Sequence, residues 1–382
     1  MRHCWRHPNA LIPGAPRGIL RDLDRWVCDQ RRREPVQLRP GPGTVFWSGR
    51  PKELRTVPAP RPAHPSDCCE PISWRILVTG ATGLYRLVGC RILGREGTVI
   101  SSDNRVIEAL TYTDSPDELR SHPIFRRRRF PRAQCLSGTY ATLAYPSAFA
   151  WFHWVVECLP RLQLLQPFLH ALDGVFIPAN VEPQLIESLV AMGVRPDQLV
   201  PLDAQSHFQP DALLVPRYCA GLNIPLWVPA FLQERIGLND RSAAPFRKLY
   251  ISRADASKRQ VLNEEQLIPI LREAGFEIIR LREHGFLEQA NLFHQAAWVI
   301  APHGAGLVNV LYSRPGVQVI ELTPSESIGP HLFHSVTTCA GGTYWWLPGR
   351  PEGPSSSPVV HQHFVVDPRR FAEALDHTGA RD

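Results

Sequence analysis

Apolar positions recur along two stretches of the chain in the rhythm of alternating strands and helices. Between residues 152 and 236, short apolar runs alternate with segments whose apolar residues follow helical spacing. The same alternation restarts after the polar, turn-rich segment 239–245. This order predicts parallel sheets covered by helices. We therefore expect two α/β domains in tandem, with ligands in the cleft between them, at the C-terminal ends of the strands.

The expected elements follow from the apolar runs and the residues that bound them. In the second stretch they are strand 248–252, helix 264–274, strand 276–280, helix 286–295, strand 297–301, helix 307–312 and strand 318–322. In the first stretch they are helix 152–169, strand 174–178, helix 183–192, strands 198–201 and 212–216, and helix 227–236. Short strands are expected at 76–78, 98–100 and 363–366, with Asp367 capping a final helix.

Residues 1–66 lack this periodicity and are rich in Pro and Arg. Only Ile19 to Cys28 predicts a short helix, so we expect an extension or a partly disordered arm. The expected division is an extension over 1–66, an α/β domain over 67–240, and a Rossmann-like domain over 241–345. A C-terminal strand and helix over 346–382 should pack back on the body.

Composition narrows the class of protein. Of the 382 residues 44% are hydrophobic and 20% are charged, which is typical of a soluble globular chain. Without an apolar signal segment near the N-terminus, a cytoplasmic location is expected, with membrane association through a partner left open. The nine cysteines are scattered and odd in number, which favours reduced thiols.

The net charge of +6 is unevenly spread. Residues 1–66 hold 13 Lys and Arg against 5 Asp and Glu, and the remainder holds 29 against 31. The body is therefore close to neutral, which argues against nucleic acid as a partner.

The strongest chemical signal is the turn Pro302-His303-Gly304-Ala305-Gly306-Leu307, which follows an apolar strand and opens a helix. Small residues there let a bulky ligand approach the backbone, and a helix N-terminus favours a diphosphate. His303 could donate to a phosphate oxygen, although a tight turn with a packed histidine would have the same sequence. Arg253 and Arg259 follow another strand and suit phosphate, unless they are solvated surface residues. Glu321 at a third strand end could accept ribose hydroxyls, or be a surface acid.

A second landmark is the run Trp151 to Leu162, in which His153 and Glu157 lie four residues apart and hence on one helix face. Either could serve as the general base for an acceptor hydroxyl, or the two could simply satisfy each other. Arg161 is either a contact for an anionic ligand or a helix-cap interaction. His361 and His363 share a strand face, but no third ligand is evident, so no metal site is expected.

Three segments, in their order and spacing, resemble the family 61 glycosyltransferases. They are Tyr-Ile-Ser-Arg-Ala-Asp-Ala-Ser-Lys-Arg-Gln-Val-Leu-Asn-Glu at 250–264, Ala-Pro-His-Gly-Ala-Gly-Leu at 301–307 and Val-Ile-Glu-Leu-Thr-Pro at 319–324. The run at 151–162 is also similar to the family's His-Trp-x-x-(acid)-x-Leu-Pro-Arg-Leu segment. Ala150 stands where the family often has Asn. The resemblance covers roughly 141–375, weakening over 181–243.

The resemblance implies a GT-B fold, in which two Rossmann-like domains face each other across a cleft. It implies an inverting hexosyl- or pentosyltransferase that moves a sugar from a nucleotide sugar to a glycan or lipid-linked acceptor in capsular or extracellular polysaccharide synthesis. The first domain would be the acceptor side and the second would bind the nucleotide sugar. Peripheral association with membrane polysaccharide machinery would be compatible with this role.

The resemblance also implies roles for individual residues. Arg253, Arg259 and the turn residues His303, Gly304, Ala305 and Gly306 would hold the diphosphate, and Glu321 would lie near the nucleoside. Asn263, Glu264 and Asn309 are candidates for supporting them. Because arginines and a helix terminus can neutralise the leaving group, neither a metal nor a further cofactor is expected. The alternative is a non-catalytic sugar- or nucleotide-binding subunit of a polysaccharide assembly complex.

Overall fold

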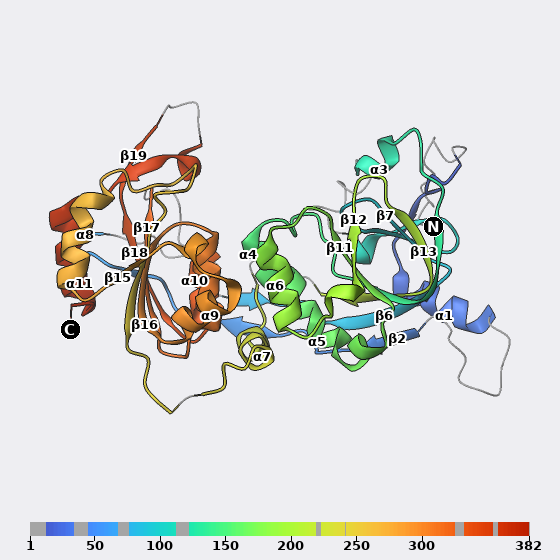
Figure 1. Ribbon diagram of the computed structural model, residues 1–382, viewed down its shortest axis with the longest axis horizontal. Helices are drawn as coiled ribbons and strands as arrows, with labels where there is room; N and C mark the ends of the chain where they lie inside the picture. The colour runs from blue at the N-terminus through green and yellow to red at the C-terminus, as the bar shows by residue number, and fades with distance from the viewer. Residues whose placement is uncertain are drawn as a thin grey trace. The chain divides into compact units, whose positions relative to one another are not determined.

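The computed structural model describes residues 13–33, 45–67, 76–111, 122–218, 223–240, 242–324, 332–353 and 358–381. The chain forms two compact units (Figure 1). Unit 1 comprises Met1–Lys52 and Gly80–Cys219, and unit 2 comprises Glu53–Thr79 and Ala220–Asp382. Both units combine sheets with helices, which confirms the α/β class. In the described ranges, no helix is long and apolar enough to cross a membrane.

Unit 2 is built on a parallel sheet whose strand order is β15-β14-β16-β17-β18-β4. The strands are β14 (Arg247–Ile251), β15 (Glu277–Ile279), β16 (Ala296–Pro302), β17 (Gln318–Thr323), β18 (Thr343–Pro348) and β4 (Arg61–Pro62). The first four match the expected strands to within a few residues, because each is an apolar run bounded by turn residues. Taken as far as β18, the order is that of a doubly wound sheet, with a switch point between β14 and β16.

Helices cover both faces of this sheet (Figure 1). On one face, α8 (Glu264–Glu273) and α11 (Pro368–Thr378) bury Leu267 and Leu375 in a core that also contains Tyr250 and Ile320 of the strands. On the other face lie α9 (Phe286–His294), the 3₁₀ helix η8 (Ala305–Tyr312) and α10 (Leu332–Cys339). The side chain of Asp367 accepts a hydrogen bond from the amide of Arg370, so it caps α11 as expected. Helix α7 (Trp227–Arg235) also belongs to unit 2.

Unit 1 contains a ten-stranded mixed sheet among its described residues. Its parallel part consists of β10 (Gln134–Thr142), β11 (Gly174–Pro178), β12 (Leu199–Leu202) and β13 (His207–Arg217). Antiparallel strands β6 (Gly83–Val88), β7 (Arg91–Leu93) and β8 (Thr98–Ile100) extend it, followed by β9 (Val106–Ile107). The sheet is thus not purely parallel, because hairpin-length connections replace helical crossovers in the earlier part of the chain. Helix α6 (Pro183–Ala191) follows β11 as expected.

The N-terminal segment is divided between the two units. Strands β1 (Ile19–Leu20) and β2 (Val45–Ser48) pair with β9 and β6, and helix α1 (Leu23–Arg33) buries Leu23 and Trp26 in the core of unit 1. Strand β3 (Leu54–Thr56) pairs with β5 (Ile76–Val78) in unit 2, where β4 adds the edge strand beside β18. The described parts of 1–66 are therefore integral to both units rather than one appendage, and the boundary expected at residue 66 does not separate them.

The expected continuous helix 152–169 is a composite. It runs as α4 (Trp151–His153), a π turn η3 (Trp154–Cys158), a 3₁₀ turn η4 (Leu159–Arg161), α5 (Leu162–Leu165) and 3₁₀ helix η5 (Gln166–Ala171). Pro160 and Pro167 each lack the amide hydrogen that an α-helix interior requires, which is why the hydrogen-bonding pattern changes around them. The spacing of the apolar residues correctly predicted a helical segment, but it does not distinguish α, 3₁₀ and π turns.

Candidate functional site

The candidate residues of unit 2 follow the two strands that flank the switch point. Arg253 and Arg259 lie in the loop after β14, and His303 and Gly304 lie directly after β16. Parallel strands end at the same edge of a sheet, so these residues are brought to one edge. In open α/β sheets this edge, at the switch point, is where ligands bind.

A partly buried hydrogen-bond network fixes the end of β14. Glu264, the first residue of α8, accepts hydrogen bonds from the Tyr250 hydroxyl at 2.9 Å and the Ser252 hydroxyl at 2.8 Å. Tyr250 is fully buried, and burial together with Glu264 raises the pKa of its hydroxyl well above the usual value. Glu264 thus joins the start of α8 to the strand end from which Arg253 extends.

Arg253 lies against the backbone of Gly304. A Cβ placed on Gly304 would lie 2.1 Å from Nη1 and 2.6 Å from Cζ of Arg253. Only glycine at this position therefore leaves room for the guanidinium where it now lies. The Nη2 group donates to the Lys258 carbonyl at 3.2 Å, while the buried Nε has no hydrogen-bond partner in the part of the chain that the structure describes.

Arg259 has a left-handed backbone, with φ at 58°, which is unfavourable for a residue other than glycine. Neighbouring contacts hold it there: the amide of Gln260 donates to His363 Nδ1 at 3.2 Å, and Nη1 of Arg259 reaches the Val360 carbonyl at 3.4 Å. Its Nε is also buried and lacks a partner among the described residues. Strain kept at a charged residue beside a candidate site is a feature of functional positions.

His303 is oriented by Glu321. The Nδ1 atom of His303 lies 2.5 Å from one carboxylate oxygen of Glu321, and the Tyr344 hydroxyl donates to the other oxygen at 2.5 Å. The side chain of Glu321 is 2% exposed and that of His303 is 17% exposed. A carboxylate acceptor fixes the proton on Nδ1 and leaves Nε2 as the imidazole's reactive nitrogen. With both oxygens engaged, Glu321 is better suited to position His303 than to contact a ribose.

The electrostatics of this edge favour an anion. Burial lowers the pKa of the Arg253 guanidinium, and the charge of Arg259 lowers it further. Burial also lowers the pKa of Arg259, an effect that Glu321 partly offsets. Neither arginine forms an ion pair with any carboxylate in the described ranges, and the nearby Asp255 is paired with Arg282 at 3.2 Å. Two partly buried cations that repel each other are stabilised by a bound anion, because it offsets both the repulsion and the desolvation.

The remaining turn residues and supporting residues hold the backbone in place. A Cβ on Gly306 would lie 2.5 Å from Leu281 Cδ1, so a larger residue after Ala305 would displace the Leu281 side chain. Asn309 is buried, and its amide donates to Gln289 Oε1 at 2.9 Å, which joins η8 to α9. Asn263 donates to the Val366 carbonyl at 2.7 Å and accepts from the amide of Val366 at 3.1 Å.

The other candidate residues lie in unit 1, on the composite helix. His153 ends α4 and is partly exposed, whereas Glu157 lies in the π turn and is 1% exposed. The His153 ring makes an edge contact with Phe152, with ring centroids 5.3 Å apart. A π turn displaces a residue four positions on from its place in an α-helix, so the shared face expected for the pair is altered. Ala150 is the N-cap of α4 and makes no side-chain cap hydrogen bond.

A comparison with known protein families gave a match over part of the chain. Residues 151–320 match the family model described as Glycosyltransferase 61. The match begins at the composite helix of unit 1 and ends within β17 of unit 2. It includes His153, Glu157, both arginines and His303. Over this stretch the chain belongs to glycosyltransferase family 61.

A comparison with curated proteins gave no match. The family 61 assignment therefore comes from the family model, which supports glycosyltransferase activity in general terms. Among the residues that the structure describes, no group of three His, Cys, Asp or Glu side chains converges as a metal site would require. His363 instead accepts the backbone hydrogen bond of Gln260.

In this family 61 transferase the sequence did not reveal the role of Tyr344. The aromatic run 344–346 was compatible with core packing or sugar stacking, whereas Tyr344 donates to Glu321 and Trp346 donates to Thr323 Oγ1 at 2.7 Å. The signal was present as alternation along β18, because residues 344 and 346 share one face. Identifying the partner, however, required the register of β17 against β18.

Proposed function

We propose that this family 61 glycosyltransferase is an inverting, metal-independent enzyme. In this proposal it moves a hexosyl or pentosyl group from a nucleotide sugar to a glycan or lipid-linked acceptor in the synthesis of a capsular or extracellular polysaccharide. The nucleotide sugar is a substrate, and the proposal requires no further cofactor. It also includes a cytoplasmic location with peripheral association with membrane polysaccharide machinery.

One observation carries the proposal: two partly buried arginines without ion-pair partners in the described chain lie in the loop after β14, and an oriented histidine follows the neighbouring strand β16. The guanidinium groups of Arg253 and Arg259 bind phosphate oxygens in a bidentate manner. The η8 terminus beside Gly304 adds backbone N–H groups directed at an anion.

The chemistry follows from charge development in the transition state. As the bond between the anomeric carbon and the diphosphate oxygen breaks, negative charge grows on the diphosphate. Arg253 and Arg259 stabilise that charge electrostatically, and the Nε2 side of His303 can donate a hydrogen bond to it when protonated. These groups are positioned before the reaction, so little reorganisation accompanies it.

Inversion requires a single displacement, in which the acceptor oxygen attacks the anomeric carbon from the face opposite the leaving diphosphate. A base removes the proton of the acceptor hydroxyl. We assign this role to His153, since its ring is partly exposed while Glu157 is buried.

The proposal is tested with the purified full chain and a panel of uridine, guanosine, adenosine and cytidine diphosphates, each followed by a thermal-unfolding shift. One diphosphate should raise the melting temperature, and its sugar derivative should be consumed in the presence of an acceptor mixture. EDTA should leave that consumption unchanged. Binding without transfer or hydrolysis would favour a non-catalytic subunit, and binding of no diphosphate would overturn the donor site.

A further inference from the structure

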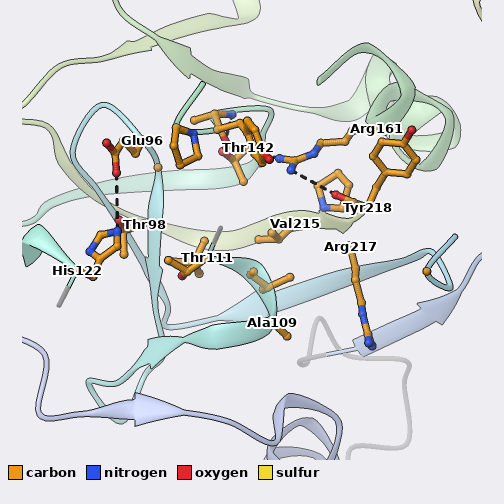
Figure 2. A pocket seen from close by; sticks show the side chains of 18 of the residues that line it. Glu96, Thr98, Ala109, Thr111, His122, Thr142, Arg161, Val215, Arg217 and Tyr218 are labelled. Carbon is orange, nitrogen blue, oxygen red and sulfur yellow. Dashed lines mark hydrogen bonds and ion pairs between the residues drawn. The ribbon is translucent and has the colours of Figure 1, made fainter. Parts of the chain in front are cut away.

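Unit 1 contains a cavity of about 360 Å³ that the donor chemistry does not use (Figure 2). Strand ends and loops of the mixed sheet line it. The lining includes Glu96, Thr98, Thr142, Arg161, Val215 and Tyr218. A cavity of this size holds one or two sugar rings. All of its lining residues belong to unit 1, whereas the arginine pair belongs to unit 2.

Arg161 supplies a buried positive charge at this cavity. It is 8% exposed, and its side chain extends from the composite helix toward Tyr218 (Figure 2). Its Nη1 and Nη2 groups reach the carbonyls of Ala144 at 3.4 Å and Tyr218 at 3.3 Å, both near the long limit of a hydrogen bond. The guanidinium lies 5.1 Å from the centre of the Tyr145 ring. In the described ranges Nε has no hydrogen-bond partner, and no carboxylate pairs with Arg161.

The other guanidinium of the lining, that of Arg217, is already engaged. Arg217 turns away from Arg161 in Figure 2 and lies 3.6 Å from Asp24 and 3.2 Å from the Tyr85 hydroxyl. Glu96 lies 3.7 Å from His122. Arg161 therefore remains as a charged group at this cavity whose hydrogen-bond donors are only partly satisfied, by two long contacts with backbone carbonyls. A buried guanidinium in that condition is destabilising unless a ligand completes its hydrogen bonds.

We propose that this cavity binds the acidic group of an anionic sugar, with Arg161 as its counter-ion. The acidic group is a planar carboxylate or a phosphate ester, both of which match the guanidinium fork. Thr98 and Thr142 line the cavity and carry hydroxyls that can hydrogen-bond to sugar hydroxyls, and the Tyr145 ring lines it as an aromatic surface for a sugar ring. The assignment of this ligand to the acceptor glycan rests on the proposed function, whereas the binding site itself does not.

The test measures binding of D-glucuronate, glucose 6-phosphate and D-glucose to the full chain by ligand-observed NMR. The two acids separate a carboxylate from a phosphate, and glucose is the neutral match. At least one acid should bind roughly tenfold more tightly than glucose, and Arg161→Gln should abolish that preference. Arg161→Lys should retain part of it. Arg195→Gln is the matched control, because Arg195 is an exposed arginine of the same unit paired with Asp197.

A second variant tests the location independently of the charge. Gly80 lines the cavity, and a Cβ there would meet no atom within 4 Å, so a side chain can start from this position. Gly80→Trp adds bulk there, and thermal unfolding beside the wild type shows whether the variant is folded. It should weaken binding of the preferred acid by roughly tenfold or more. Equal binding of acids and glucose, an unchanged preference in a folded Arg161→Gln protein, or unchanged binding in Gly80→Trp would overturn the proposal. Failure of the proposed function would appear separately, as loss of nucleotide binding with acid binding intact.

Discussion

Replacing Gly304 by alanine tests whether the position of the Arg253 guanidinium determines donor binding. The added Cβ would lie 2.1 Å from Nη1 and 2.6 Å from Cζ of Arg253. An ordinary contact is about 3.4 Å or longer, so the guanidinium must move by roughly 1 Å. The Arg253 side chain is flexible and can yield, so the fold should tolerate the change.

The cost should appear in binding rather than in stability. A charge-assisted hydrogen bond is worth about 1.5–3 kcal/mol, so loss of one such contact to the diphosphate weakens affinity roughly 10- to 150-fold. The assay is titration calorimetry of the wild type and Gly304→Ala with the nucleoside diphosphate that shifts the melting temperature. Gly80→Ala serves as the control, because its Cβ would lie in open space in the other unit. Wild-type affinity in a folded Gly304→Ala protein would refute the reasoning.

Three further changes test the neighbouring contacts. Arg259→Gly should leave thermal stability equal or raise it by roughly 1 kcal/mol, since it relieves a left-handed backbone, while calorimetry shows diphosphate affinity reduced about tenfold or more. Tyr344→Phe removes the hydroxyl that donates a hydrogen bond to buried Glu321, and should lower the free energy of denaturant unfolding by about 1–3 kcal/mol. The kcat should fall more than the affinity for the nucleotide sugar, and an unchanged kcat would contradict the positioning role of Tyr344. Burial lowers the pKa of His122 below 6.5, an effect that Glu96 partly offsets, so its protonation opposes folding. Stability should therefore fall as pH drops below about 6.5, and His122→Asn should flatten that part of the profile.

The helices and strands of unit 2 could be predicted from the sequence because the local residue pattern of each one favours the structure that it adopts. Strand 318–322, for example, is observed as Gln318–Thr323, since an apolar run bounded by glycine and proline has few alternatives. Strand β10 had no such signal. Its sequence, Gln-Cys-Leu-Ser-Gly-Thr-Tyr-Ala-Thr, is largely polar, and it is a strand because β11 and β13 pair with both of its edges.

Some residues of the candidate site could likewise be predicted from the sequence, whereas the roles of others required the structure. Arg253, Arg259 and His303 were recognisable because their residue types suit phosphate and they follow strands. The role of Glu321 depends on which side chains face it, and these come from β16 and β18, which are separated from it in sequence. The left-handed backbone of Arg259 is likewise set by contacts with residues 360–364 rather than by its neighbours. Both the partners of Glu321 and the backbone conformation of Arg259 depend on contacts between segments distant in sequence, which local sequence patterns do not predict.

The central claim is that Arg253 and Arg259 hold the leaving diphosphate of a nucleotide sugar. The most direct measurement is calorimetric titration of the wild type and of the Arg253→Gln, Arg259→Gln double variant with the nucleoside diphosphate that the panel selects. Arg247→Gln is the matched control, because Arg247 is paired with Glu277 at 2.7 Å at the opposite end of β14. The account predicts at least a hundredfold loss of affinity in the folded double variant and none in the control, since two charge-assisted contacts are removed. Equal affinity in the wild type and the double variant would contradict it.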